Sequence, residues 1–347
     1  MGETMSRLGL VLSAIASGGF TRHTHTPYCP AAPLAVAPGA ADALRAFDYS
    51  RAPIAYRNRI LPALESSTHL VRFVRFPSAG LCRQRDGLVA GHYYHSKHEG
   101  EKPLVIVLPI FGSYTYPTRA MLRTLRRHYG GDCHLLQLLG EEYLLDWFGL
   151  AAIRTHEECN AKAREMAECM RVAVIDLRRV LDWAEARPEI DARRIAVIGF
   201  SMSAFLAALA LGVEPRFRAG VIAFGGAHPA DIFASCGGKP GMAKAAVMEK
   251  LGLTREAYYA LIEAETDCND PAHFSGLYRP ERILYFDARY DSCMPARSRD
   301  DLWEAMGRPE RYTFDYDHKS AFLAMTPLGR NFLRRKTVAF LDRVLAC

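Results

Sequence analysis

Three side chains that can act together in acyl transfer each follow an apolar segment of the sequence. Ser201 follows RIAVIGF, Asp291 follows RILYFDARY, and His318 follows RYTFDYD. A serine hydroxyl becomes a nucleophile when an imidazole accepts its proton, and the imidazole needs a carboxylate that fixes its tautomer. The chain order Ser, Asp, His therefore predicts a nucleophile, an orienting acid and a base.

The residues around Ser201 indicate a sharp turn between a strand and a helix. RIAVIGFSMSAFLAALAL begins as a β-branched apolar run and continues as a helix of small residues. A nucleophile at such a junction is held in a strained backbone conformation, so the positions two before and two after it must be small. Gly199 and Ser203 meet that requirement. A helix N-cap is the other common use of such a serine, and Ser203 is the nearest competing nucleophile.

Alternatives exist for the acid and for the base. Asp291 could instead cap a helix that begins near Pro295, and the rival acids are Asp287, Asp315 and Asp317. We favour Asp291 because it lies in a turn after the strand, whereas Asp287 suits a structural carboxylate at the strand end. Of the 12 histidines, His318 alone follows the last predicted strand and both other members. His273 is interpreted as a packing or lid residue.

Two backbone N–H groups are expected to bind the oxyanion of a tetrahedral intermediate. The first belongs to Met202, at the start of the helix after Ser201. The second should come from the loop after PLVIVLP, where Pro109 has no N–H. Phe111 is the first choice and Ile110 the second, and Gly112 would let the loop approach a ligand closely.

The elements that must position these residues alternate between strand and helix. Strands are expected at VRFVRF, LVAGHYYH, 103–109, CHLLQLL, RIAVIGF, AGVIAFGG, RILYFDA and RYTFDYD, and a long helix at about 155–187, before Pro188. This order predicts an α/β fold with a mainly parallel, doubly wound sheet and helices on both faces. Residues 1–64 are expected to form an extension, and 65–347 one domain with a helical insertion at about 230–278, which is either a lid or a rigid decoration.

Aromatic side chains offer a weaker prediction about the substrate pocket. Tyr114, Tyr116 and Trp147 follow predicted strands and could line an acyl or alcohol pocket, or belong to the core.

Composition limits the classes of function. Half of the 347 residues are hydrophobic, and the net charge of +6 is spread over short clusters such as LRRHYG and NFLRRK. A nucleic-acid-binding role would need a concentrated basic patch, so none is expected. No apolar run reaches the ~18 residues of a membrane span.

Cysteine usage favours a cytoplasmic location. The nine cysteines include no C-x-x-C pair, a pattern typical of free thiols in a reducing compartment. LGLVLSAIASGGF is a weak match to a secretory signal.

Three longer segments carry a family resemblance. They are similar to the elbow, acid-turn and histidine regions of the α/β-hydrolase superfamily. In that order the segments are DLRRVLDWAEARPEIDARRIAVIGFSMS, NDPAHFSGLYRPERILYFDARYDSCMP and LWEAMGRPERYTFDYDHKS. Within it, the chain most resembles dienelactone hydrolases, acetyl xylan esterases and peptidase-like serine hydrolases. It departs from the usual pattern in three places: G-F-S-M-S replaces G-x-S-x-G, LPIFG replaces a His-Gly pair, and Ala288 stands where many relatives have glycine.

The resemblance implies hydrolysis of a small-molecule ester or related acyl bond through an acyl-enzyme on Ser201. His318 would be the base and Asp291 its orienting acid, and no cofactor or metal would be required. Two alternatives stay open at this point: a peptidase, amide or thioester hydrolase with the same triad, and a binding protein that has lost turnover. The sequence leaves the oligomeric state undetermined.

Overall fold

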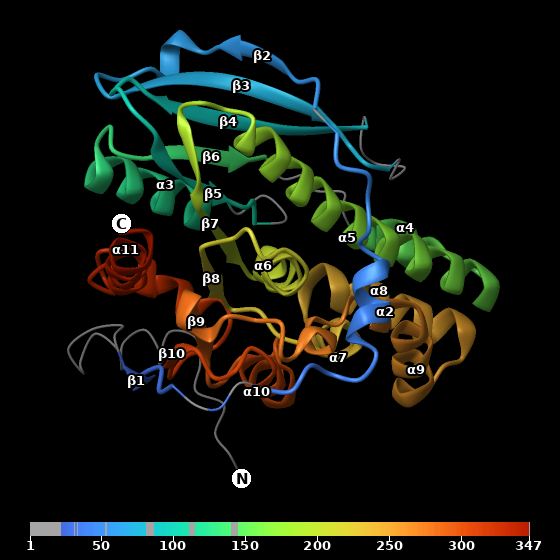
Figure 1. The fold of residues 1–347 in the computed structure, drawn as a ribbon. Helices are drawn as coiled ribbons and strands as arrows, with labels where there is room; N and C mark the ends of the chain where they lie inside the picture. The colour runs from blue at the N-terminus through green and yellow to red at the C-terminus, as the bar shows by residue number, and fades with distance from the viewer. Residues whose placement is uncertain are drawn as a thin grey trace.

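A sheet forms the centre of the molecule, with helices on both of its faces (Figure 1). The computed structural model describes residues 22–30, 32, 34–52, 54–80, 87–110, 115–139 and 145–346. Within these residues the sheet has ten strands in the order β1-β10-β9-β8-β7-β5-β6-β4-β3-β2. The strands are β1 (His23–Thr26), β2 (Arg57–Ile60), β3 (His69–Pro77), β4 (Leu88–Ser96), β5 (Lys102–Val107), β6 (His134–Leu138), β7 (Ile190–Phe200), β8 (Ala219–Ala223), β9 (Ile283–Ala288) and β10 (Glu310–Phe314).

The helices occupy the connections between these strands, as the alternating pattern predicts. The α-helices are α2 (Ala40–Arg45), α3 (Tyr116–Tyr129), α4 (Trp147–Ala152), α5 (His156–Glu185), α6 (Met202–Val213), α7 (Pro229–Ser235), α8 (Gly238–Leu251), α9 (Arg255–Thr266), α10 (Ala296–Ala305) and α11 (Phe332–Leu345). The 3-10 helices are η1 (Pro62–Leu64), η2 (Asp267–Asn269), η3 (Pro271–Phe274), η4 (Pro280–Arg282) and η5 (Ser320–Met325).

The sheet is parallel at its centre and antiparallel at both ends. Strands β6, β5, β7, β8, β9 and β10 pair in parallel. Strand β1 pairs antiparallel with β10, and β2, β3, β4 and β6 form an antiparallel succession. The expected mainly parallel, doubly wound α/β sheet is therefore confirmed.

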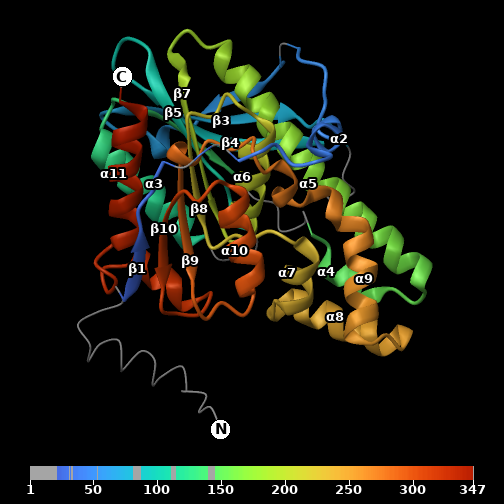
Figure 2. The ribbon, with the colours of Figure 1, turned by 60° about the horizontal axis from the view of Figure 1, so that its bottom comes forward.

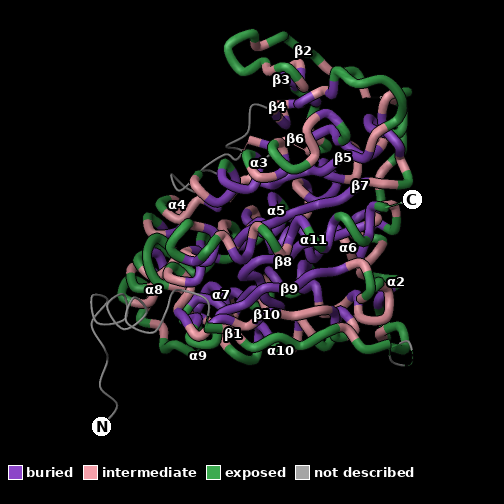
Figure 3. Tube along the Cα trace, turned by 90° about the vertical axis from the view of Figure 1, so that its left-hand side faces the viewer, coloured by how far each residue is buried: buried purple, intermediate pink, exposed green. Residues whose placement is uncertain are grey.

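The central strands are buried on both faces, which explains their unbroken apolar sequences. In β7, Ile195 and Val197 pack into one core, while Ala196, Ile198 and Phe200 pack into the other. Figure 3 shows the central strands as the buried middle of the trace. Helices α3 and α11 cover one face, and α5, α6 and α10 cover the other, as Figure 2 shows.

The amino-terminal segment contributes to the sheet instead of lying wholly outside it. The polar strand β1 (HTHT) pairs with β10, and β2 (RNRI) pairs with β3. Phe47 is fully buried in the core beneath α5 and α6. Among the described strands both lie at the ends of the sheet, where polar residues fit. The boundary at residue 64 stays a prediction.

The expected helical insertion lies between the end of β8 and the start of β9. It holds α7, α8 and α9 and the short helices η2 to η4. Helix α8 packs against α4, and α9 against α5, so these helices form a group at one side of the sheet (Figures 1 and 2). Its action as a lid stays a prediction.

The prediction that all cysteines are free thiols is wrong for one pair. Cys236, directly after α7, forms a disulfide with Cys293, which lies between β9 and α10. The two are 57 residues apart, so no short spacing motif marks them. Cys29, Cys133, Cys159 and Cys268 are free thiols. The cytoplasmic location stays a prediction.

None of the helices in the described part of the chain has the length and apolar character that crossing a bilayer requires.

Candidate active site

Ser201, Asp291 and His318 lie together at the carboxyl ends of β7, β9 and β10. The Ser201 hydroxyl lies 2.9 Å from His318 Nε2, and His318 Nδ1 lies 2.6 Å from Asp291 Oδ2. Parallel strands end at one edge of the sheet, so residues that are 117 and 27 positions apart in sequence meet there. The structure thus joins the three predicted residues in one hydrogen-bonded chain.

Ser201 occupies the predicted sharp turn between β7 and α6. Its φ is +54°, in the region that side-chain-bearing residues rarely adopt. Its N–H donates to Ala223 O of β8, which ties the turn to the neighbouring strand. A Cβ at Gly199 would collide with the backbone of Ser203 and Ala204, which is why this position holds glycine.

Ser203 adds a contact that its small size alone did not predict. Its hydroxyl accepts a hydrogen bond from Phe200 N–H at 2.8 Å and donates one to Phe200 O at 3.0 Å. The side chain is fully buried. Ser203, at the position two after Ser201, therefore fastens Phe200, the residue directly before Ser201.

We expect Ser203→Ala to destabilise the elbow without removing the nucleophile. A buried N–H left without its acceptor costs about 1–3 kcal/mol, and each kcal/mol lowers the melting temperature of a chain this long by about 2–4 °C. Thermal unfolding followed by circular dichroism should show that loss, with Ser201 still reactive. The exposed Ser50→Ala is the control; equal melting of both variants would contradict the assignment.

Asp291 is the buried end of the hydrogen-bonded chain. Its side chain is 0% exposed, against 15% for His318. Oδ1 accepts the N–H groups of Cys293 and Met294, each at 2.8 Å, which leaves Oδ2 for the imidazole. These donors belong to the backbone, so side-chain chemistry in the sequence gave no signal for them.

The rival acids are engaged elsewhere. Asp287 is buried and forms ion pairs with Arg299 and Arg311. The other two are Asp315, which pairs with Arg289, and Asp317, which accepts the N–H groups of Lys319 and Ser320. His273 contacts Asp267. The geometry thus leaves Asp291 as the carboxylate on the imidazole.

Two aromatic rings flank the imidazole of His318. Phe224 and Phe322 meet it edge to face, with ring centroids 6.3 and 6.0 Å away. They restrict the ring to the plane in which one nitrogen reaches Ser201 and the other Asp291. Phe224 follows β8 with φ +62°, a conformation that sequence patterns do not reveal.

Of the predicted oxyanion donors, the structure describes Met202 and Ile110. Met202 is the first residue of α6, where helix N–H groups have no acceptor within the helix, so its N–H suits an anion. Phe111, Gly112 and Tyr114 lie outside the described residues. Ile110 is described and half-buried.

The remaining aromatic residues of the pocket prediction pack within the protein. Tyr116 donates to Met325 O at 3.5 Å, and Trp147 packs edge-on against Phe233. A substrate-lining role for either one stays a prediction.

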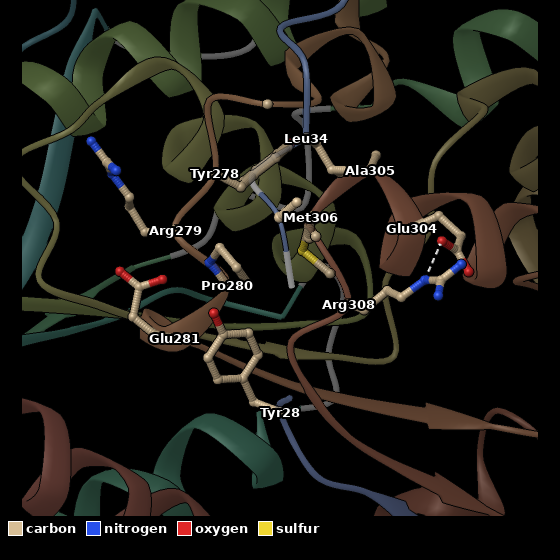
Figure 4. A pocket seen from close by; sticks show the side chains of 13 residues that line it. Tyr28, Leu34, Tyr278, Arg279, Pro280, Glu281, Glu304, Ala305, Met306 and Arg308 are labelled. Atoms are coloured by element: carbon tan, nitrogen blue, oxygen red, sulfur yellow. Dashed lines mark hydrogen bonds and ion pairs between the residues drawn. The ribbon is translucent and has the colours of Figure 1, made fainter. Parts of the chain in front are cut away.

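The protein has a pocket of about 420 Å³, whose lining side chains are drawn in Figure 4. It is lined by the amino-terminal segment at Tyr28 and Leu34, by the residues around Pro280, and by Met306 at the end of α10. Ser201, Asp291 and His318 are not among its lining residues. Within it Arg308 pairs with Glu304. We therefore assign it no part in the chemistry at Ser201.

A second histidine, His228, holds the base of the insertion. Its Nδ1 lies 2.9 Å from Asp270 and its Nε2 2.7 Å from Asp301. The hydrogen bond to Asp270 opposes desolvation and, with that to Asp301, raises the pKa of His228 from 6.5 to about 9. The charged imidazolium thus joins the start of α7 to η3 and α10. Its signal in the sequence, GGAHPAD after β8, was not recognised.

The raised pKa of His228 predicts a stability contribution that depends on pH. The folded pKa lies above the unfolded one, so the contribution is complete below about pH 6.5 and is lost as pH rises through about 9. Arg297 also faces the site and opposes the charge. Melting temperatures of wild type and His228→Gln should differ by about 2–8 °C at pH 6 and converge at pH 10. A gap that is constant with pH would contradict the assignment.

Comparison with known proteins identifies the fold. No protein-family model matches the chain. The uncharacterized protein YdjC of Bacillus subtilis (strain 168) is 29% identical over 95 residues, which are 26% of this chain and 81% of that protein.

Solved structures resemble the chain over most of its length. The acetyl xylan esterase from Paenibacillus sp. R4 matches with a TM-score of 0.64 and 16% identity, over 88% of this chain and 93% of its own. Acetyl xylan esterase 1 from Thermoanaerobacterium sp. JW/SL YS485 matches with a TM-score of 0.60 and 15% identity, over 94% and 97%. The acylaminoacyl peptidase of Pyrococcus horikoshii gives 0.53 and 15%, over 80% of this chain and 42% of that one. At these identities the likeness establishes the fold.

Proposed function

We propose that this protein, which has the α/β-hydrolase fold, is a serine hydrolase that cleaves an ester through an acyl-enzyme on Ser201. The supporting observation is the hydrogen-bonded chain of Ser201, His318 and Asp291 at 2.9 and 2.6 Å, on a nucleophile held at positive φ. A helix N-cap, the competing use of Ser201, needs no imidazole at hydrogen-bond distance, and the Ser201 side chain makes no cap hydrogen bond.

Acylation begins when His318 Nε2 accepts the Ser201 proton while Oγ attacks the ester carbonyl. The imidazolium that forms is stabilised by Asp291, whose buried carboxylate receives the Nδ1–H. Met202 N–H, at the positive end of α6, donates to the developing oxyanion. We assign the second donor to Phe111. The imidazolium then protonates the leaving alcohol, and water activated by His318 hydrolyses the acyl-enzyme.

The extent of the structural likeness favours an ester substrate over an amide substrate. The two acetyl xylan esterases match over more than nine-tenths of their own length, whereas the acylaminoacyl peptidase matches over 42%. The substrate is therefore proposed to be a small-molecule ester that this chain can bind alone. The insertion α7 to α9 is proposed to act as its lid.

The test combines a substrate panel with a covalent probe. Aryl esters of short acids, acyl thioesters and aminoacyl anilides would be offered to the purified full chain, and a fluorophosphonate probe would report the reactive serine by peptide mass spectrometry. We expect turnover of esters and labelling at Ser201. Turnover of anilides alone would favour the peptidase, and absence of both turnover and labelling would favour the binding protein.

A further inference from the structure

The triad acid lies in a turn that is fastened from two sides. The turn runs from Asp291 to Pro295, between β9 and α10. On one side Arg299 Nε of α10 donates to Met294 O at 3.0 Å. On the other side Cys293, whose N–H donates to Asp291 Oδ1, is joined by its sulfur to Cys236.

The disulfide connects the triad to the helical insertion. Cys236 directly follows α7, and its N–H donates to Ile232 O at the end of that helix. A covalent path therefore runs from α7 through Cys236 and Cys293 to the N–H that Asp291 accepts.

We propose that the Cys236–Cys293 disulfide positions the triad acid, so that its reduction lowers turnover at Ser201. This inference rests on the proposed function, because it assigns redox control to that same site. Cys293 and Met294 are the backbone donors to Oδ1, and Oδ1 sets the direction in which Oδ2 faces His318. When the sulfur anchor is released, Arg299 still holds Met294, but the position of Cys293 N–H is fixed only by the backbone of the turn.

The expected consequence is a fall in kcat with little change in KM. Misplacement of a catalytic group by about 1 Å can cost ~10²-fold in rate, and a partial loosening should cost about tenfold. Substrate binding does not use Asp291, which is fully buried. A bond that only stabilised the fold would change the melting temperature and leave both kinetic constants unchanged at low temperature.

Reduction can begin at Cys236. Cys236 is half-buried and is followed by the exposed Gly237 and Gly238, which have open space around them, whereas Cys293 is 8% exposed. A dithiol reductant attacks the Cys236 sulfur, and the Cys293 thiolate leaves and takes a proton. The second thiol of the reductant then releases Cys236 as a thiol. Two electrons and two protons pass to the protein, and the reductant becomes a cyclic disulfide.

The experiment compares the oxidised and the dithiothreitol-reduced full chain well below its melting temperature. Peptide mass spectrometry establishes the Cys236–Cys293 bond, and kcat and KM for an aryl acetate are measured in each state and after reoxidation with oxidised glutathione. We expect kcat to fall about tenfold on reduction, KM to change less than about twofold, and kcat to return on reoxidation.

Two variants separate the disulfide from other thiols. Cys236→Ser breaks the bond on the side away from Asp291 and should have the reduced kcat and no response to dithiothreitol. Cys268→Ser removes an exposed free cysteine and should behave as wild type in both states. If Cys236→Ser does not fold, reversible reduction of wild type gives the same comparison.

A second readout keeps this inference apart from the proposed function. The His318 Nδ1–H proton, hydrogen-bonded to Asp291, should give a low-field NMR resonance that broadens or shifts on reduction whether or not the protein turns over esters. If the protein is inactive in both states but the resonance still changes on reduction, the proposed function is overturned and the inference about the disulfide is not. An unchanged kcat and an unchanged resonance after cleavage of the bond, or absence of the bond from the oxidised protein, would overturn the inference.

Discussion

Ser201→Ala should reduce kcat/KM for the best aryl ester by about 10⁴- to 10⁶-fold and abolish fluorophosphonate labelling. The hydroxyl removed is the atom that attacks the carbonyl, and it is 2.9 Å from the imidazole that accepts its proton. Activity that remains would come from an oxyanion site and from binding, which accelerate the reaction of water only weakly.

The fold should tolerate this substitution. Alanine keeps the Cβ that serine already carries at φ +54°, and the hydroxyl makes no capping hydrogen bond to α6. We therefore expect the melting temperature to remain within about 2 °C of wild type. Ser50→Ala, at an exposed position, should match wild type in both rate and stability. Retention of a tenth or more of the activity by Ser201→Ala would contradict Ser201 as nucleophile.

The parts of this fold that were predictable are those in which one local pattern decides the structure. The apolar runs of β5 and β7 are buried on both faces, so their sequences predict central strands without knowledge of the rest of the chain. The turn at Ser201 was predictable for the same reason, because the strand, the small neighbours and the following helix are contiguous.

The parts that were not predictable depend on residues brought together by folding. The strands β1 and β2 are polar and become strands only because a sheet edge is available to pair with them. The Cys236–Cys293 bond has no spacing motif, because the two residues meet only when α7 packs beside the acid turn. The sequence predicts only that Ser203 is small enough for the turn. Its hydrogen bonds to Phe200 depend on the geometry of the folded turn.

The same distinction applies to His228. Its partners are Asp270, directly before η3, and Asp301 of α10, which are 42 and 73 residues away in sequence. Burial opposes the charged form of Asp270, yet the hydrogen bond from His228 lowers its pKa. Such clusters become visible only when three elements are placed around one ring.

Asp291→Asn should lower kcat by about 10³- to 10⁴-fold while leaving the fold intact, because it reverses the polarity of one contact. The aspartate accepts three hydrogen bonds, two at Oδ1 from backbone N–H groups and one at Oδ2 from His318. An asparagine has a single oxygen, which the two N–H groups would keep, so its NH₂ would face Nδ1. His318 must then carry its proton on Nε2, where it cannot accept the proton of Ser201.

The control and the readout for this last prediction follow from that tautomer argument. Asp315→Asn, which alters a surface ion pair with Arg289, should leave kcat unchanged. Fluorophosphonate labelling of Asp291→Asn should slow in parallel with kcat, since both need Nε2 as the base, while KM stays within about threefold of wild type. Retention of more than about a tenth of the wild-type kcat by Asp291→Asn would show that another group orients His318 and that the buried carboxylate serves the acid turn alone.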